Sequence, residues 1–136
     1  MKLIVCIDDL NGMCFNGRRQ SRDRAVVSYI SKIVGNRPLW TAPSSVSLFD
    51  NRDLTINAAD DFLEKAGTDD FCFAEINDVT QYINACRMVY LFRWNREYPT
   101  DLYFPAERLQ EEFQQLECVE FKGFSHPQLT LEVYAR

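Results

Sequence analysis

The sequence of 136 residues contains a single histidine and no Cys-x-x-Cys pair. With only His126 available, a hydrolase site built on several metal-bound histidines cannot be assembled, and we predict no metal site. Serine–histidine or cysteine–histidine catalysis would need His126 itself. That residue precedes Pro127 in a predicted turn between two strands, so we interpret it as a hairpin residue.

Long apolar runs are also missing. No stretch approaches the roughly 18 apolar residues of a membrane span, and the opening MKLIVCIDDL is too short for a signal peptide. Hydrophobic residues make up 46% of the chain and charged residues 26%, the balance of an ordinary soluble globular protein. We therefore expect a cytoplasmic protein without a membrane partner, formed by a single domain over residues 1–136.

The five cysteines are odd in number, which does not favour a disulfide framework. Four of them have apolar neighbours, and we predict that Cys6, Cys72, Cys86 and Cys118 are buried free thiols in a reducing compartment. Cys14 lies in a glycine-flanked loop and is the one candidate for a functional thiol.

Charge is unevenly distributed along the chain. The formal net charge is -5, yet residues 1–37 hold seven lysines and arginines against three aspartates. Four of these arginines fall between Arg18 and Arg24. A chain with a pI near 4.9 is a poor general nucleic-acid binder. A local basic patch for one anionic ligand is consistent with this composition.

Apolar patterns predict alternating strands and helices. Ser21 is the predicted N-cap of the first helix, and a loop over residues 8–20 leaves the carboxyl end of the first strand, where open sheets bind ligands. The alternation predicts a three-layer α/β fold, with a mainly parallel sheet, helices on both faces and a C-terminal antiparallel hairpin. The predicted strands cover 2–7, 37–41, 53–57, 70–76, 87–94, 116–124 and 128–136, and the predicted helices cover 22–34, 44–50, 58–67, 78–86 and 106–113.

The segments KLIVCIDDLNGMCFNGR and SRDRAVVSYISKIVGNRPLW follow one another at the start of the chain. The first resembles the first strand and mobile loop of the dihydrofolate reductase family, and the second resembles the helix and second strand that follow there. VYLFRWNREYPTDLYFP and LTLEVYAR resemble its late strand, its D-x-x-F-P connector and its final strand. The similarity is collinear over nearly the whole chain. It implies a dihydrofolate reductase-like fold.

The resemblance weakens where the family binds NADPH. After the second strand the family has a glycine and a basic residue, whereas this chain has Thr41, Ala42 and Pro43. Thr41, with Ser44 and Ser45 from a helix start, could still donate hydrogen bonds to a cofactor. The family's Gly-Gly pair is replaced by Glu75 and Ile76, which adds bulk and negative charge. We expect a degraded NADPH site.

On the substrate side, Asp23 matches the catalytic carboxylate that holds the pterin ring in the family. Burial raises the pKa of such a carboxyl, which suits the role. An aspartate in a first helical turn is equally favoured by the helix dipole. Both interpretations of Asp23 stay open.

The arginine cluster has three interpretations: solvated charge, an anion site, or a contact with a protein or RNA. In the anion site, Arg18, Arg19 and Arg22 would bind a phosphate or carboxylate, with Asn16 and Ser21 adding hydrogen bonds. Arg24 is expected to point outward. Apolar walls for the same cleft would come from Met13, Phe15, Tyr29 and Trp40.

These features lead to one hypothesis and two alternatives. The leading hypothesis is a small-molecule-binding protein that holds a planar or anionic, pterin- or nucleotide-like ligand at the Asp8–Arg24 loop. The first alternative is an active NADPH-dependent reductase, and the second is a non-catalytic interaction module that uses the arginine loop. Whether the protein is an enzyme stays open, as does its oligomeric state.

Overall fold

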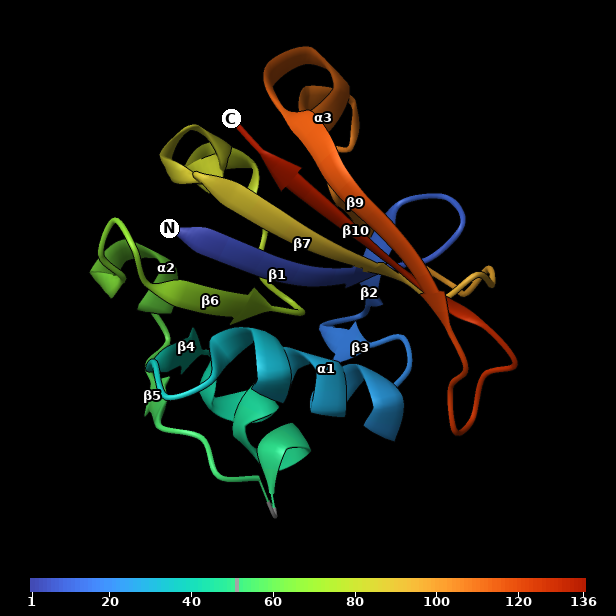
Figure 1. Ribbon diagram of the computed structural model, residues 1–136, viewed down its shortest axis with the longest axis horizontal. Coiled ribbons are helices and arrows are strands. Elements are labelled where there is room, and N and C mark those ends of the chain that lie inside the picture. Colours follow the sequence, from blue (N-terminus) through green and yellow to red (C-terminus); the bar gives the residue numbers. More distant parts are fainter. Residues whose placement is uncertain (51) are drawn as a thin grey trace.

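The central strand, β1 (Lys2–Ile7), has buried residues on both of its faces, because a strand alternates its side chains and each face of this sheet is covered. Leu3, Val5 and Ile7 enter one core cluster and Ile4 enters the other. The structure is a computed structural model that describes residues 1–50 and 52–136 (Figure 1).

In the part of the chain that the structure describes, the main sheet has seven strands in the order β5-β4-β6-β1-β7-β10-β9. Its first five strands are parallel, and β10 joins β7 in the antiparallel sense, with β9 at the far edge. The predicted α/β fold with a C-terminal antiparallel hairpin is therefore confirmed. The strands besides β1 are β4 (Leu39–Thr41), β5 (Ile56–Ala58), β6 (Phe71–Ala74), β7 (Met88–Arg93), β9 (Gln114–Phe121) and β10 (Leu129–Ala135).

Helices cover both faces of this sheet (Figure 1). On one face, α1 (Arg24–Val34) and the 3₁₀ helix η1 (Pro43–Phe49) pack on β6, β7 and β10. On the other face lie α2 (Phe62–Lys65), the 3₁₀ helix η2 (Thr80–Ala85) and α3 (Glu107–Glu112). Within the described residues, no helix has both the length and the apolar character to cross a membrane.

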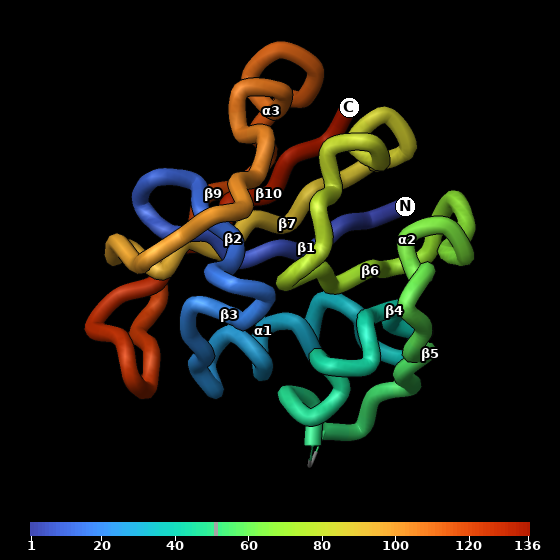
Figure 2. Tube along the Cα trace, turned by 180° about the vertical axis from the view of Figure 1, so that it is seen from behind, coloured from blue at the N-terminus to red at the C-terminus, as the bar shows by residue number. Residues whose placement is uncertain are grey.

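The segment predicted as a loop over residues 8–20 contains two strands. β2 (Gly12–Phe15) pairs with β3 (Arg18–Arg19) and with β8 (Leu102–Tyr103) in a small second sheet (Figure 2). The loop prediction missed these strands because Asn16 and Gly17, both at positive φ, form the tight turn of a hairpin. This hairpin places Arg18 and Arg19 on a defined strand beside the start of α1.

Several helices begin or end at other residues than predicted. The predicted cap Ser21 is wrong, because Asp23 is extended and its carboxylate accepts from the Ala25 N–H, so α1 starts at Arg24. η1 begins at Pro43 with Ala42 as its cap, one residue before the predicted serine start. The helices predicted over 58–67 and 78–86 shorten to α2 and η2.

The prediction that four cysteines are buried is wrong for Cys6, which is half-buried, and for Cys118. Cys118 lies exposed on edge strand β9, because the flanking side chains there face solvent. Cys14 is buried in β2 with 2% exposure, although its neighbours are loop-like in sequence. Burial raises the pKa of the Cys72 thiol to about 12 and that of Cys86 to about 11. These buried thiols are therefore unreactive.

Candidate functional site

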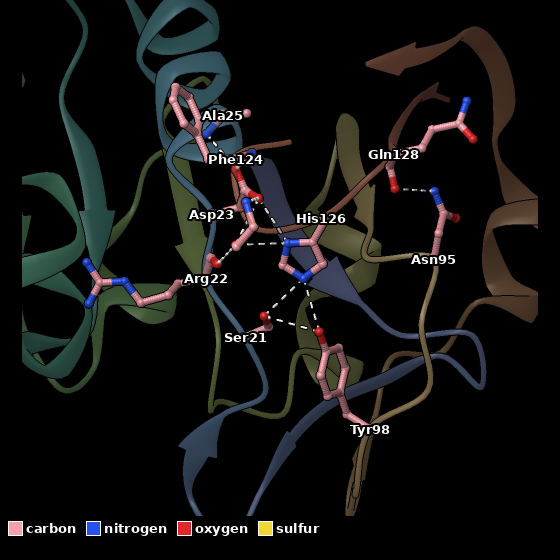
Figure 3. Close-up of polar contacts among 10 residues, drawn as sticks. Ser21, Arg22, Asp23, Ala25, Asn95, Tyr98, Phe124, His126 and Gln128 are labelled. Carbon is pink, nitrogen blue, oxygen red and sulfur yellow. Dashed lines mark hydrogen bonds and ion pairs between the residues drawn. The ribbon is translucent and has the colours of Figure 1, made fainter. Parts of the chain in front are cut away.

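The start of α1 and the connection between β9 and β10 meet at Asp23 (Figure 3). Oδ1 of Asp23 accepts from the backbone N–H groups of Ala25 at 2.8 Å and Phe124 at 3.0 Å. Oδ2 accepts from the Ser125 N–H at 2.9 Å and the Ser125 hydroxyl at 3.1 Å, and it lies 2.9 Å from Nδ1 of His126. Both carboxylate oxygens are thus fully used within the protein.

These contacts control the charge of Asp23. Burial raises the pKa of its carboxyl, but hydrogen bonds from Phe124, His126, Ala25 and Ser125 outweigh burial and hold the pKa well below its usual range. Asp23 is therefore a carboxylate at neutral pH. Since a carboxylate can only accept, Nδ1 of His126 carries the proton between them.

His126 is a buried residue, with 3% exposure, although the sequence presents it as an ordinary turn residue. Its Nε2 lies 3.1 Å from the Ser21 hydroxyl and 3.0 Å from the Tyr98 hydroxyl. The Tyr98 hydroxyl also donates to Ser21 at 3.3 Å, and the indole of Trp94 stacks on the imidazole with centroids 5.0 Å apart. The network is not evident in the sequence because its members are up to 105 positions apart.

Gly123 makes this close approach sterically feasible. A Cβ atom at this position would lie 2.6 Å from Oδ2 of Asp23 and 2.7 Å from the carbonyl oxygen of His126. Real Cβ atoms essentially never come so near, so any side chain here would push the connection away from α1. The glycine is the sequence signal that could have indicated the contact.

A second polar network joins β3 to the end of β6. The Arg19 guanidinium binds Glu75 with two contacts, Nε to Oε2 and Nη2 to Oε1, both at 3.0 Å. Arg19 Nη2 also donates to the carbonyl oxygen of Ser44 at 3.1 Å, and the Ser45 hydroxyl donates to Glu75 at 2.7 Å. Arg19 and Ser45 are thus both bonded to Glu75, and the carbonyl oxygen of Ser44 is bonded to Arg19.

The predicted apolar walls lie in separate places. Met13 is buried in the core on the sheet face opposite α1, and Phe15 is 49% exposed on β2. Tyr29 packs against Phe92 and Phe121 with centroids 6.0 and 5.0 Å away. Trp40 donates to Asp70 at 3.1 Å. The structure therefore does not gather these side chains around one cleft.

The remaining predicted polar residues are also dispersed. Thr41 is buried and its hydroxyl donates to the Phe73 carbonyl oxygen at 3.0 Å. The Asn16 N–H donates to Asp101 at 3.0 Å in the hairpin turn. Arg18 is exposed and borders a shallow hollow of about 250 Å³ that Arg19 and Glu75 also line.

A hollow between the start of α1 and the end of η1 has a volume of about 540 Å³. Its lining includes Arg22, Arg24 and Arg52, together with Asp23 and Asp50. Of the predicted arginines, the structure therefore brings Arg22 here and leaves Arg18 and Arg19 elsewhere. Arg24, expected to point outward, is exposed and lines the same hollow, and Arg52 joins it from the segment after η1.

A deeper hollow, lined among others by Cys6, Phe49, Phe73 and Trp94, has a volume of about 10 Å³. Such a space holds about one water molecule. Side chains thus fill the interior beneath Asp23. Across residues 1–50 and 52–136, no group of three or more His, Cys, Asp or Glu side chains is arranged to hold a metal ion.

No protein-family model matches this sequence, and no curated protein sequence matches it. Among solved structures, a dihydrofolate reductase from Enterococcus faecalis, complexed with NADP(H) and RAB-propyl, matches with a TM-score of 0.70. The match covers 99% of this chain and 95% of that chain at 12% sequence identity. The chain therefore has the dihydrofolate reductase fold, as its resemblance in sequence predicted.

Proposed function

We propose that the protein binds a small anionic molecule in the hollow between α1 and η1, through the guanidinium groups of Arg22, Arg24 and Arg52. One observation carries this proposal: the three arginines line one hollow of about 540 Å³, and no ion pair among the described residues uses any of them. Guanidinium groups bind carboxylate and phosphate with two parallel hydrogen bonds. The volume is typical of small-molecule sites.

The filled interior limits what else the ligand contains. A pterin ring placed as in a reductase would have to displace the side chains around the hollow of about 10 Å³. The Asp23 oxygens that would hold that ring already accept from Ala25, Phe124, Ser125 and His126. In our proposal the arginines therefore bind the anionic group of the ligand, and any ring of the ligand lies near the protein surface.

We also propose that ordinary NADPH binding has been lost. Glu75 stands where the resemblance places a glycine of the family's Gly-Gly pair, and its carboxylate would repel cofactor phosphates. Arg19, the nearest guanidinium, is bound to Glu75 and so is not free for a phosphate. The alternative of an active NADPH-dependent reductase requires this ion pair to open.

A thermal-shift panel of inorganic phosphate, ADP, folate and NADPH tests the proposal. We expect at least one of the first three anions to raise the melting temperature by several degrees at saturating concentration. The shift should disappear in Arg52→Ala and persist in Lys32→Ala, which removes a positive charge from the exposed face of α1 outside the hollow.

Two results would contradict the proposal. A shift produced by NADPH at sub-millimolar concentration and unaffected by Arg52→Ala would favour the reductase. Absence of any shift, together with capture of an acidic protein that depends on the exposed Arg18, would favour the interaction module.

A further inference from the structure

Ser21, His126 and Asp23 form a continuous hydrogen-bonded series (Figure 3). The Ser21 Oγ is 3.1 Å from Nε2 of His126, and Nδ1 of the same ring is 2.9 Å from Oδ2 of Asp23. We propose that these residues are a serine–histidine–aspartate triad that hydrolyses small carboxylic esters. The inference does not depend on the arginine hollow or on its ligand.

The proton positions suit this role. The Asp23 carboxylate fixes the proton on Nδ1, so Nε2 of the neutral ring carries the lone pair. Tyr98 donates to Ser21, and Ser21 can then donate its own proton to Nε2. A hydroxyl that donates to a histidine base is the arrangement that activates a serine nucleophile.

The surroundings of His126 favour the charged ring that forms during attack. Asp23 stays ionised because the hydrogen bonds from Ala25, Phe124 and Ser125 hold its charge independently of the histidine. The face of the Trp94 indole stacks on the imidazole, with 25° between the two planes. An aromatic face attracts a cation, so both neighbours stabilise imidazolium.

The reaction balances with water as the second substrate. The Ser21 oxygen forms a bond to the ester carbonyl carbon while its proton moves to Nε2 of His126. The bond to the leaving alkoxide breaks, and that alkoxide takes the proton from Nε2. Water then attacks the acyl-serine, gives its proton to Nε2, and Ser21 recovers it as the carboxylic acid leaves.

Tyr98 is placed to stabilise the transition state. Its hydroxyl is 3.3 Å from the Ser21 Oγ, so it can turn its O–H from that oxygen toward the oxyanion that develops beside it. Hydrogen-bond donors at this position are worth about 10²-fold or more in rate. Ser21 is half-buried, and the hollow of about 10 Å³ that it lines is too small for an acyl group, so in this proposal the ester approaches the Ser21 Oγ from the solvent side.

The test uses a fluorophosphonate probe, with the modified residue located by mass spectrometry, and p-nitrophenyl acetate as substrate. We expect a single adduct on Ser21, none in Ser21→Ala, and unchanged labelling in Ser28→Ala, a half-buried serine on α1. His126→Gln should slow labelling about 100-fold or more. Tyr98→Phe should slow acetate hydrolysis while leaving the adduct on Ser21.

Asp23 acts through His126, so its test needs a measurement that a purely structural role of Asp23 would not change. In Asp23→Asn the imidazole should change tautomer, visible in the nitrogen spectrum of the single histidine, and hydrolysis should fall by about 10⁴-fold. If His126→Gln does not fold, Ser21→Cys replaces it. The thiol of that variant should react with iodoacetamide faster at pH 7 than the exposed Cys118.

An adduct on Tyr98 or on any residue other than Ser21 overturns the proposal. So does the absence of an adduct between pH 7 and 9, or a thiol in Ser21→Cys that reacts more slowly than Cys118. Labelling of Ser21 that is independent of His126 also overturns it, because the histidine would then not be the base.

Discussion

Arg19 and Glu75 form a bidentate ion pair that links the β2–β3 hairpin to the end of β6, with both nitrogen–oxygen distances at 3.0 Å. Neither side chain is more than 25% exposed, so solvent screens the pair only partly. Ser45 adds a third hydrogen bond to Glu75 at 2.7 Å. The β2–β3 hairpin is thus held at the end of β6 by an ion pair and by hydrogen bonds.

Glu75→Gln should loosen this hairpin. The substitution keeps the shape of the side chain but removes the charge that holds Arg19, and we expect a loss of about 1–3 kcal/mol in the free energy of unfolding. Proteolysis should also become faster within residues 12–20. Glu97→Gln, an exposed glutamate without an ion pair among the described residues, is the matched control. Equal stability of the two variants would contradict the role of the pair.

Asp23→Asn should destabilise the protein in a pH-dependent way. Burial raises the pKa of Asp23 but its hydrogen bonds lower it further, so the folded-state pKa lies below the unfolded value of 3.8. The carboxylate therefore contributes stability above that value, and the contribution is lost as the pH falls below it. We expect a difference of about 3 kcal/mol at pH 7 that shrinks below pH 4, measured by urea unfolding. A difference that is constant between pH 7 and pH 3 would contradict this.

Gly123→Ala should displace the connection between β9 and β10. The added methyl group would lie 2.6 Å from Asp23 and 2.7 Å from His126, so we expect a loss of about 1–3 kcal/mol. The imidazole signals of His126 should shift as well. Gly67→Ala, where the nearest atom is 3.2 Å away at the end of the Asp70 side chain, should cost less. Equal costs would show that the connection does not approach α1 closely at Gly123.

Thiol labelling should distinguish the cysteines by burial. Cys118 is exposed and should react with iodoacetamide in the native protein. Burial raises the pKa of the thiols of Cys6, Cys14, Cys72 and Cys86, so these should react only after unfolding. Mass spectrometry before and after denaturation gives the comparison. Labelling of Cys14 at the rate of Cys118 would contradict the burial of β2.

The fold could be predicted because local patterns encode it. In β1 the apolar run is continuous because both faces of the sheet are covered there. In β10, Leu129, Leu131 and Val133 alternate along the strand because they point to the same covered face. The strands β2 and β3 were missed because their pairing depends on a turn at positive φ and on β8, which is far away in sequence. Pattern alone does not contain those contacts.

The sequence indicates candidate arginines but not their partners. Arg22 lines the hollow between α1 and η1, whereas Arg19 is bound to Glu75, a partner that nothing in its own segment indicates. His126 lies in the predicted connection between two strands, but its burial comes from Asp23 and Trp94, which the sequence does not indicate. Partners in tertiary structure, rather than neighbours in sequence, determine the roles of these side chains.

The position of the bound anion tests the proposed function most directly. A crystal structure grown with phosphate, ADP or folate, whichever gives the largest thermal shift, should show the anionic group in contact with the guanidinium groups of Arg22, Arg24 and Arg52. The Arg19–Glu75 pair should remain closed in the same crystal. Density for the anion at Arg18 and Ser44 with that pair open, or none in the hollow between α1 and η1, would contradict the proposed function.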